Sequence, residues 1–392
     1  MKLTLPQTDG ALASYTLSGR DAWAAPAHPR FNRIAYSAAH VVADARADVD
    51  PWLHCAIDWD ATIAYRRRLW SMGLGVAEAM DTAQRGMGLD WPTSLELIRR
   101  SLAAAREMPG ALIASGCGTD QLAPEAARSV DDVIHAYEEQ MAAIESLGGR
   151  LIVMASRALA RVAQGPGDYE RVYDRVLSQA REPVILHWLG DMFDPALHGY
   201  WGSADVDAAM GTALAIIEAH AGKVDGIKIS LLDKEREIAM RRRLPAGVRM
   251  YTGDDFNYAE LIDGDGVGAA ATQQHSDALL GIFDAIAPAA SAALSALAEG
   301  HTARFHEILA PTVPLSRHIF RAPTRFYKTG VVFMAWLNGH QDHFVMVGGQ
   351  QSTRSIVHFA ELFRLADAAG LIEQPDLAAT RMRHLLALHG IT

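Results

Sequence analysis

Short apolar runs alternate with longer amphipathic segments along most of this chain. Runs rich in β-branched residues and bounded by glycine, proline or polar residues predict strands that are buried on both faces. After an irregular arm over residues 1–30, we recognise eight such runs. They predict strands at 33–40, 76–81, 111–116, 151–156, 183–189, 226–230, 248–252 and 266–272.

Segments with apolar residues at helical spacing follow these strands. Eight β-then-α repeats match the size and order of an α/β protein with a (β/α)8 TIM barrel. A doubly wound open sheet is the alternative, but such sheets usually have fewer strands. The barrel helices are expected at 59–72, 94–106, 130–147, 168–181, 204–221, 233–243, 256–262 and 275–299.

The pattern divides the chain into three parts. Residues 1–30 form an N-terminal arm, 31–300 form the barrel, and 301–392 form a helical region. We expect this last region to pack on the barrel as additional C-terminal helices and not to form a separate catalytic unit. Its helices are predicted at 305–310, 331–337, 355–368 and 376–389.

Composition narrows the class of protein. A formal net charge of -10 argues against a nucleic-acid partner, which would require a basic patch. Two cysteines cannot form a disulfide framework and fit a reducing, cytoplasmic location. We find neither a secretory signal nor an apolar segment long enough to span a membrane, so no membrane partner is expected. Two arginine runs, 66–68 and 241–243, are expected on solvated or ion-pairing surfaces of helices.

Lys228 is the most informative residue for chemistry. It is one of only five lysines and lies within the apolar strand 226–230, whereas the other four have polar or loosely apolar surroundings. Burial lowers the pKa of a lysine, and a neutral amine can attack a carbonyl to form a Schiff base. The alternative is a structural lysine at a strand end that reaches solvent.

The carboxyl ends of the predicted strands carry the polar side chains from which a barrel enzyme would build its active site. Because all eight ends meet at one mouth, we expect these side chains to converge. The polar segments are 81–86, 115–120, 156–157, 187–191, 228–230, 251–255 and 272–275.

Three strand ends together resemble a known family. Residues 183–187 (Pro-Val-Ile-Leu-His), 226–228 (Gly-Ile-Lys) and 252–255 (Thr-Gly-Asp-Asp) are similar to consecutive strand ends of the dihydrodipicolinate synthase/N-acetylneuraminate lyase family. Residues 266–270 resemble its eighth strand, and Tyr327-Lys328 its C-terminal helix. These are class I, Schiff-base aldolases on a barrel with extra C-terminal helices, and the chain resembles a divergent branch.

The resemblance implies catalytic roles for Lys228 and His187. Lys228 would form the imine with a 2-oxo acid. His187 stands where the family has a proton-relaying tyrosine, and histidine also moves protons near neutral pH. The family binds the pyruvate carboxylate through a stretch after strand 2 of which only Thr82 survives here, so pyruvate is not an assured substrate. Arg85 or Arg157 could replace the lost anion contacts.

These arguments give a predicted set of substrate-binding residues around the mouth. Hydroxyl and amide groups would hold the oxygens of the substrate, and the two carboxylates would orient the mouth or a hydroxylated tail. The set comprises Thr82, Gln84, Ser115, Thr119, Tyr251, Asp254 and Asp255.

The predicted function is a carbon–carbon lyase or aldol-type synthase that acts on a small 2-oxo (keto) acid or a sugar-derived substrate, without a cofactor or a metal. We expect a homo-oligomer, either a dimer or a tetramer. One alternative is a metal-dependent barrel aldolase or isomerase, and another is a non-catalytic barrel. The metal ligands would come from His187, Asp191, Asp194, His198, Asp254, Asp255 and His275.

Overall fold

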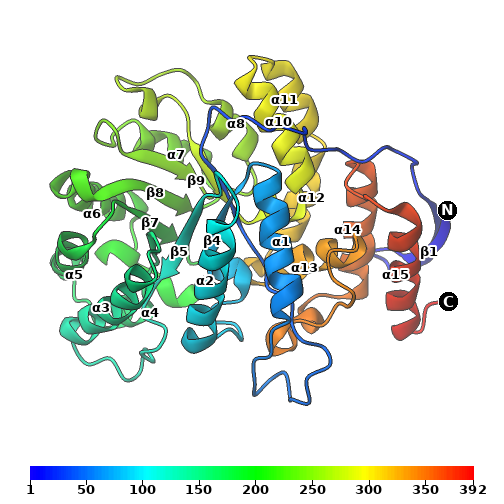
Figure 1. Cartoon of the computed structure of the whole chain (residues 1–392), viewed down its shortest axis with the longest axis horizontal. Coiled ribbons are helices and arrows are strands. Elements are labelled where there is room, and N and C mark those ends of the chain that lie inside the picture. The colour runs from blue at the N-terminus through cyan, green and yellow to red at the C-terminus, as the bar shows by residue number, and fades with distance from the viewer.

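The computed structural model describes residues 1–392 and contains a closed barrel of eight parallel strands (Figure 1). Consecutive strands are neighbours, and the last strand, β10, pairs with the first, β3. The predicted (β/α)8 barrel is therefore confirmed. Its strands are β3 (Ala35–Ala38), β4 (Gly75–Glu78), β5 (Ile113–Cys117), β6 (Leu151–Val153), β7 (Val184–Leu189), β8 (Val224–Ser230), β9 (Arg249–Thr252) and β10 (Asp277–Leu280).

Helices surround the barrel, and several begin at a carboxylate that caps the first turn. Asp58 accepts a hydrogen bond from the backbone N–H of Ala61, and Asp90 accepts one from Thr93, so orphan donors are satisfied. The helices are α1 (Trp59–Ser71), α2 (Trp91–Arg106), α3 (Val130–Ser146), α4 (Arg157–Val162), α5 (Pro166–Gln179), α6 (Val206–Ala219), α7 (Lys234–Arg241), α8 (Tyr258–Asp263), α9 (Ile282–Ala285) and α10 (Ala287–Ala298).

The eighth strand lies further along the chain than predicted. Residues 266–272 are mostly loop, in which Gly266 and Gly268 have φ values of 65° and 154°. The short 3-10 helix η5 (Ala271–Gln273) follows, and β10 then closes the barrel between β9 and β3. The expected helix over 275–299 was therefore wrong in its first part. Consequently, residues 272–275 precede the strand and do not lie at its mouth end.

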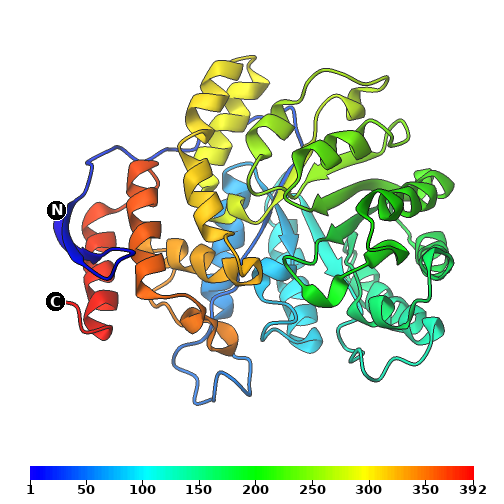
Figure 2. The ribbon, with the colours of Figure 1, turned by 180° about the vertical axis from the view of Figure 1, so that it is seen from behind.

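The C-terminal region is helical, as expected, and packs on the barrel (Figure 2). One continuous hydrophobic core of 102 residues includes barrel residues such as Val76 and C-terminal residues such as Phe333 and Met382, so this region shares the barrel's core. The sequence prediction missed α12. The helices are α11 (Thr302–Leu309), α12 (Thr312–Ile319), α13 (Tyr327–Leu337), α14 (Ile356–Ala368) and α15 (Pro375–Leu388).

The N-terminal arm is not wholly irregular. Strands β1 (Lys2–Pro6) and β2 (Leu12–Thr16) form an antiparallel hairpin next to the C-terminal helices (Figure 1). The hydroxyl of Tyr15 donates to Asp367 at 2.6 Å, and the indole N–H of Trp23 donates to the carbonyl of Ala369 at 2.9 Å. The arm is therefore attached to the C-terminal region. None of the helices has the length and apolar character that crossing a membrane requires.

Side chains on the barrel strands alternate between the interior and the helical shell, as strand geometry requires. The shell contains charged groups that the sequence pattern placed in solvent. Arg66 is fully buried and pairs with Glu78 at 2.9 Å, and Arg241 is also buried. Both arginines form ion pairs, as one of the two expectations had it, but the expected surface location was wrong for them. A separate small core fills the barrel interior: Tyr36, Ala38, Ala77, Met80, Ala114, Ile152, Met154, Ile185, Tyr251 and Leu279.

Candidate active site

Lys228 and His187 lie side by side near the carboxyl end of the barrel. Their Cα atoms are register partners on β8 and β7, two residues beyond the pair Gly226 and Ile185. Ile185 belongs to the interior core, and side chains two residues apart on a strand share a face. Both His187 and Lys228 therefore point into the barrel at the end where barrel enzymes place their chemistry.

The Lys228 ammonium is buried without an ionic partner. Its exposed fraction is 7%, and Lys234 is the only lysine with a carboxylate within 4.0 Å. Burial lowers the pKa of Lys228, although the negative charges of Asp255 and Asp81 raise it. A lysine in such a place reaches its neutral, nucleophilic form more readily than a surface lysine does.

Gly253 gives Lys228 the space that it occupies. A Cβ atom on Gly253 would lie 2.8 Å from Cε of Lys228 and 2.3 Å from Oγ of Ser230. Both distances are shorter than any van der Waals contact, so a side chain here would displace Lys228. The glycine of the Thr-Gly-Asp-Asp segment thus has a steric role next to the candidate nucleophile.

His187 has no hydrogen-bond partner in the protein. It is 1% exposed, and both of its ring nitrogens are buried without a partner. Burial and the charge of Lys228 hold the pKa of His187 well below its usual range, so the ring is neutral at pH 7. A neutral imidazole has one donor and one acceptor nitrogen, and the protein satisfies neither of them.

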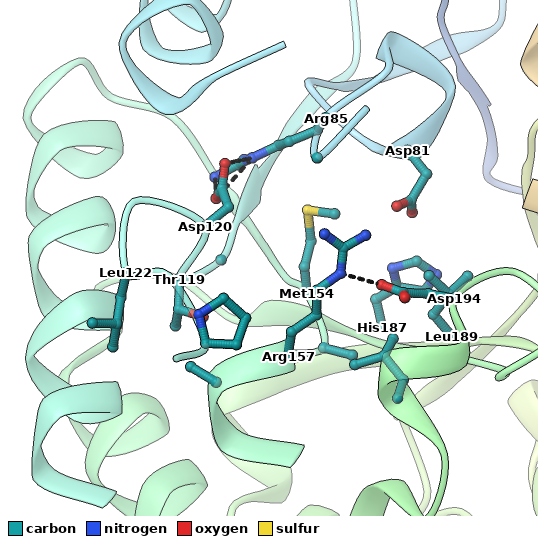
Figure 3. Close-up of a pocket in the computed structure, with 16 residues that line it drawn as sticks. Asp81, Arg85, Thr119, Asp120, Leu122, Met154, Arg157, His187, Leu189 and Asp194 are labelled. Carbon is teal, nitrogen blue, oxygen red and sulfur yellow. Dashed lines mark hydrogen bonds and ion pairs between the residues drawn. The ribbon is translucent and has the colours of Figure 1, made fainter. Parts of the chain in front are cut away.

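A cavity of about 140 Å³ opens at this end of the barrel (Figure 3). In Figure 3, the Arg157 guanidinium extends into the cavity beside Asp194, with Asp81 across from it and His187 behind. Asp194 accepts a hydrogen bond from Nε of Arg157. The lining residues are Asp81, Arg85, Gly86, Gly118, Thr119, Asp120, Leu122, Pro124, Met154, Ala155, Arg157, Ala158, His187, Leu189, Asp194 and Leu197.

The two predicted carboxylates after β9 have different environments. Asp254 accepts hydrogen bonds from the backbone N–H groups of Phe256 and Asn257, so it stabilises the turn before α8. Asp255 accepts from the backbone N–H of Ile282 at 2.9 Å, and burial raises its pKa to about 7, against the lowering effect of Lys228. Asp255 is therefore the carboxyl group suited to proton transfer near neutral pH.

Two of the predicted hydroxyl residues lie at the mouth. Thr119 lines the cavity and shares a hydrogen bond of 2.6 Å with Ser156. Thr82 shares one of 2.8 Å with the hydroxyl of Tyr327, which α13 brings from the C-terminal region. A Cβ on Gly281 would lie 3.1 Å from the Tyr327 ring and 3.4 Å from the Thr82 hydroxyl, so this glycine allows their close approach.

Of the seven predicted binding residues only Thr119 lines the cavity, and the side chains of three others are directed elsewhere. Ser115 is on the face of β5 opposite to the interior residue Ala114, so it faces the helical shell. The amide of Gln84 donates to the carbonyl of Val347 at 2.7 Å and holds the loop after β4 against the C-terminal region. Tyr251 is in the barrel interior, where its hydroxyl donates to Asp225 near the start of β8, at the opposite end of the barrel.

The two arginines suggested for anion binding differ in availability. Arg85 lines the cavity, but its guanidinium contacts both carboxylate oxygens of Asp120, the carbonyl of Gly116 and the amide oxygen of Gln140. By contrast, the protein provides a partner only for Nε of Arg157, and both of its Nη groups are free to donate.

The candidate metal ligands do not cluster. Asp191 and His198 pair with each other at an exposed site, and Asp194 holds Arg157. His275 precedes β10 at the opposite end of the barrel. No group of three or more His, Cys, Asp and Glu side chains is arranged to hold a metal ion.

Tyr327 and Lys328 were not predicted as binding or catalytic candidates, although they contact Thr82 and Met87 in the segment after β4. Lys328 is 4% exposed and lies on α13, every residue of which is buried. The expectation that it has polar or loosely apolar surroundings was wrong. The signal was available in the sequence, because Lys328 precedes the apolar run Val331–Leu337 just as Lys228 lies in an apolar strand.

The chain matches a family model over nearly its whole length. A family model described as "Protein of unknown function (DUF993)" matches residues 3–391. A comparison with curated proteins finds no match to the chain.

Solved structures of the dihydrodipicolinate synthase family resemble the chain in three dimensions. A putative dihydrodipicolinate synthetase from Pseudomonas aeruginosa has 15% sequence identity and a TM-score of 0.63, with 86% of this chain and 99% of that chain covered. The dihydrodipicolinate synthase from Aquifex aeolicus has 12% identity and a TM-score of 0.60, over 92% and 98% of the two chains. The chloride-inhibited enzyme from Acinetobacter baumannii complexed with pyruvate has 13% identity and a TM-score of 0.62, over 87% and 99%. The resemblance noted in the sequence is thus confirmed at the level of the fold.

Proposed function

The chain belongs to the family described as protein of unknown function (DUF993), and from its barrel mouth we propose that it is a carbon–carbon lyase or aldol-type synthase. In this proposal Lys228 forms an imine with a 2-oxo acid. The observation that carries it is the buried ammonium of Lys228, which has no carboxylate within 4.0 Å and lies beside the unpartnered ring of His187. The fold shared with dihydrodipicolinate synthases supports the same reading.

The proposed chemistry begins with the neutral amine of Lys228. Its nitrogen attacks the ketone carbon of the 2-oxo acid, and the resulting carbinolamine loses water to give a protonated imine. Loss of a proton from the adjacent carbon gives an enamine, whose carbon attacks an aldehyde to form the new carbon–carbon bond. The lyase direction runs these steps in reverse, and hydrolysis of the imine then frees Lys228.

Two groups near Lys228 are suited to moving the protons. His187 is neutral and has both nitrogens free, so it can accept a proton at one and donate from the other. Asp255, whose pKa burial raises to about 7, exchanges a proton readily at neutral pH. Thr82 and Thr119 provide hydroxyl groups for the oxygens of the substrate.

The test is to trap the imine by reduction. The protein is incubated with pyruvate or a larger 2-oxo acid, reduced with borohydride, weighed and mapped by peptide mass spectrometry. We expect an adduct on Lys228 in the native protein and in the control Lys234→Ala, which removes a solvent-accessible lysine, but none in Lys228→Ala. A folded protein that gives no adduct with any 2-oxo acid, or an adduct on another lysine, would contradict the proposal. The first outcome would favour a non-catalytic barrel.

A further inference from the structure

A second buried ammonium, that of Lys328, lies against the loop after β4, just outside the residues that line the cavity. The Nζ atom of Lys328 donates to the carbonyl of Arg325 at 3.1 Å and contacts the sulfur of Met87 at 3.3 Å. Both of these partners are uncharged, and no carboxylate lies within 4.0 Å of the Lys328 ammonium. An ammonium has three donors, and a thioether is a weak acceptor. The remaining contact of Lys328 is with the ring of Tyr327, whose centroid lies 4.8 Å away, so no anion compensates the charge of Lys328 directly.

Lys328 and Arg157 approach the same loop. Met87, which contacts Lys328, follows Gly86, and a Cβ on Gly86 would lie only 3.3 Å from Nη1 of Arg157. Gly86 and Arg157 both line the cavity, and Figure 3 shows the guanidinium extending into it. Since Nε is the only nitrogen of Arg157 that donates to Asp194, both Nη groups of Arg157 remain available to a ligand.

Lys328 and Lys228 are influenced by a common charged neighbour, Asp81. Asp81 and Asp194 raise the pKa of Lys328, Arg157 and Arg325 lower it, and Asp81 also acts on Lys228. Three of these four charged neighbours line the cavity. The two buried lysines thus lie near one carboxylate at the mouth, and Lys328 approaches it from α13.

We infer that Lys328 and Arg157 form an anion subsite that binds a carboxylate of the substrate while Lys228 reacts with its ketone. The role of this subsite in the reaction rests on the proposed function. The subsite requires that the substrate carry a negative charge. An ammonium and a free guanidinium edge are the groups that bind carboxylates most strongly. It would provide the anion contacts that the loop after β4 lacks, since Arg85 is held by Asp120.

The test uses a ligand that cannot form an imine. Malonate, a dicarboxylate without a ketone, and its neutral counterpart malonamide are titrated into the protein by calorimetry. We expect malonate to bind the native protein and Lys228→Ala, and malonamide to bind neither. Lys328→Met and Arg157→Met should each weaken malonate binding roughly tenfold or more, because each removes a charge-assisted hydrogen bond. Lys234→Met, a control at the surface, should leave it unchanged.

The pH dependence gives a second readout. Burial lowers the pKa of Lys328 to about 8, so its ammonium is charged at pH 7 and is lost above pH 8. Malonate affinity should fall between pH 8 and 9 in the native protein and in Arg157→Met, and not in Lys328→Met. The absence of malonate binding, or equal affinity in the native protein and both methionine variants, would overturn the anion subsite. Because no imine is involved, this result is independent of the trapping of Lys228. If Lys328→Met does not fold, Arg157→Met alone decides.

Discussion

Replacing Lys328 by methionine should make the protein more stable at neutral pH. Lys328 is 4% exposed, and burial lowers its pKa from 10.5 to about 8. A difference of this size means that holding the proton in the folded state costs about 3 kcal/mol. Methionine has a similar length and no charge, but it loses the hydrogen bond to Arg325, worth about 1 kcal/mol. We expect a net gain of about 2 kcal/mol at pH 7.

The sign of the pH effect follows from the direction of the pKa shift. A lysine whose folded pKa is lowered destabilises the fold fully below pH 8, where both states hold the proton. This destabilisation declines as the pH rises from 8 towards 10.5, where both states are neutral. The advantage of Lys328→Met over the native protein should therefore shrink across that range.

Urea unfolding at pH 7, 8, 9 and 10 measures this difference directly. The control Lys234→Met removes a solvent-accessible lysine and its ion pair with Glu260, so its stability should stay within about 1 kcal/mol of the native value at every pH. A Lys328→Met protein that is less stable than the native protein by the same amount at all pH values would refute the reasoning. A stabilised variant that no longer binds malonate would show why an unfavourable ammonium is retained.

Three further predictions concern the mouth and the shell. Gly253→Ala should abolish adduct formation on Lys228 and destabilise the protein by roughly 1–3 kcal/mol, because its Cβ would overlap the lysine. Trapping and urea unfolding check this, with Gly211→Ala as a control, since nothing lies within 4 Å of that Cβ. Burial raises the pKa of Asp255 to about 7, so the initial rate of imine trapping should change with pH around pH 7. Asp255→Asn should remove this inflection. An unchanged pH profile in the variant would exclude Asp255 as the proton carrier. Burial also raises the pKa of Glu237 from 4.5 to about 8, so the folded protein binds the proton of this carboxyl more tightly than the unfolded chain does. The stability that the protonated carboxyl contributes is therefore full below pH 4.5 and declines as the pH rises to 8. Glu237→Gln should lose this decline in urea unfolding, a difference of at most about 5 kcal/mol, and an identical pH profile would contradict it.

Most of the barrel strands and the position of the candidate nucleophile could be predicted from the sequence. Repeated apolar runs and amphipathic segments predicted eight strands with their helices, and seven of the strands were placed correctly within a few residues. Lys228 stood out because an ammonium is rare in an apolar strand, and His187 because it ends the preceding strand. These inferences depend on local composition and strand order, which the chain itself contains.

The position of the eighth strand and the placement of three of the seven predicted binding residues depended on tertiary structure. Residues 277–280 (Asp-Ala-Leu-Leu) are compatible with a helix, and they form a strand because the barrel needs a last neighbour between β9 and β3. Ser115 lies on the face of β5 that is directed towards the helical shell, and the local sequence does not indicate which face of a strand lies inside the barrel. The proposed site also involves Tyr327 and Lys328, about 100 residues beyond Lys228 in the chain. The packing of α13 on the barrel brings them next to the segment after β4. This packing is driven by burial of the apolar surface of α13 against residues distant in the sequence, which no local pattern reveals.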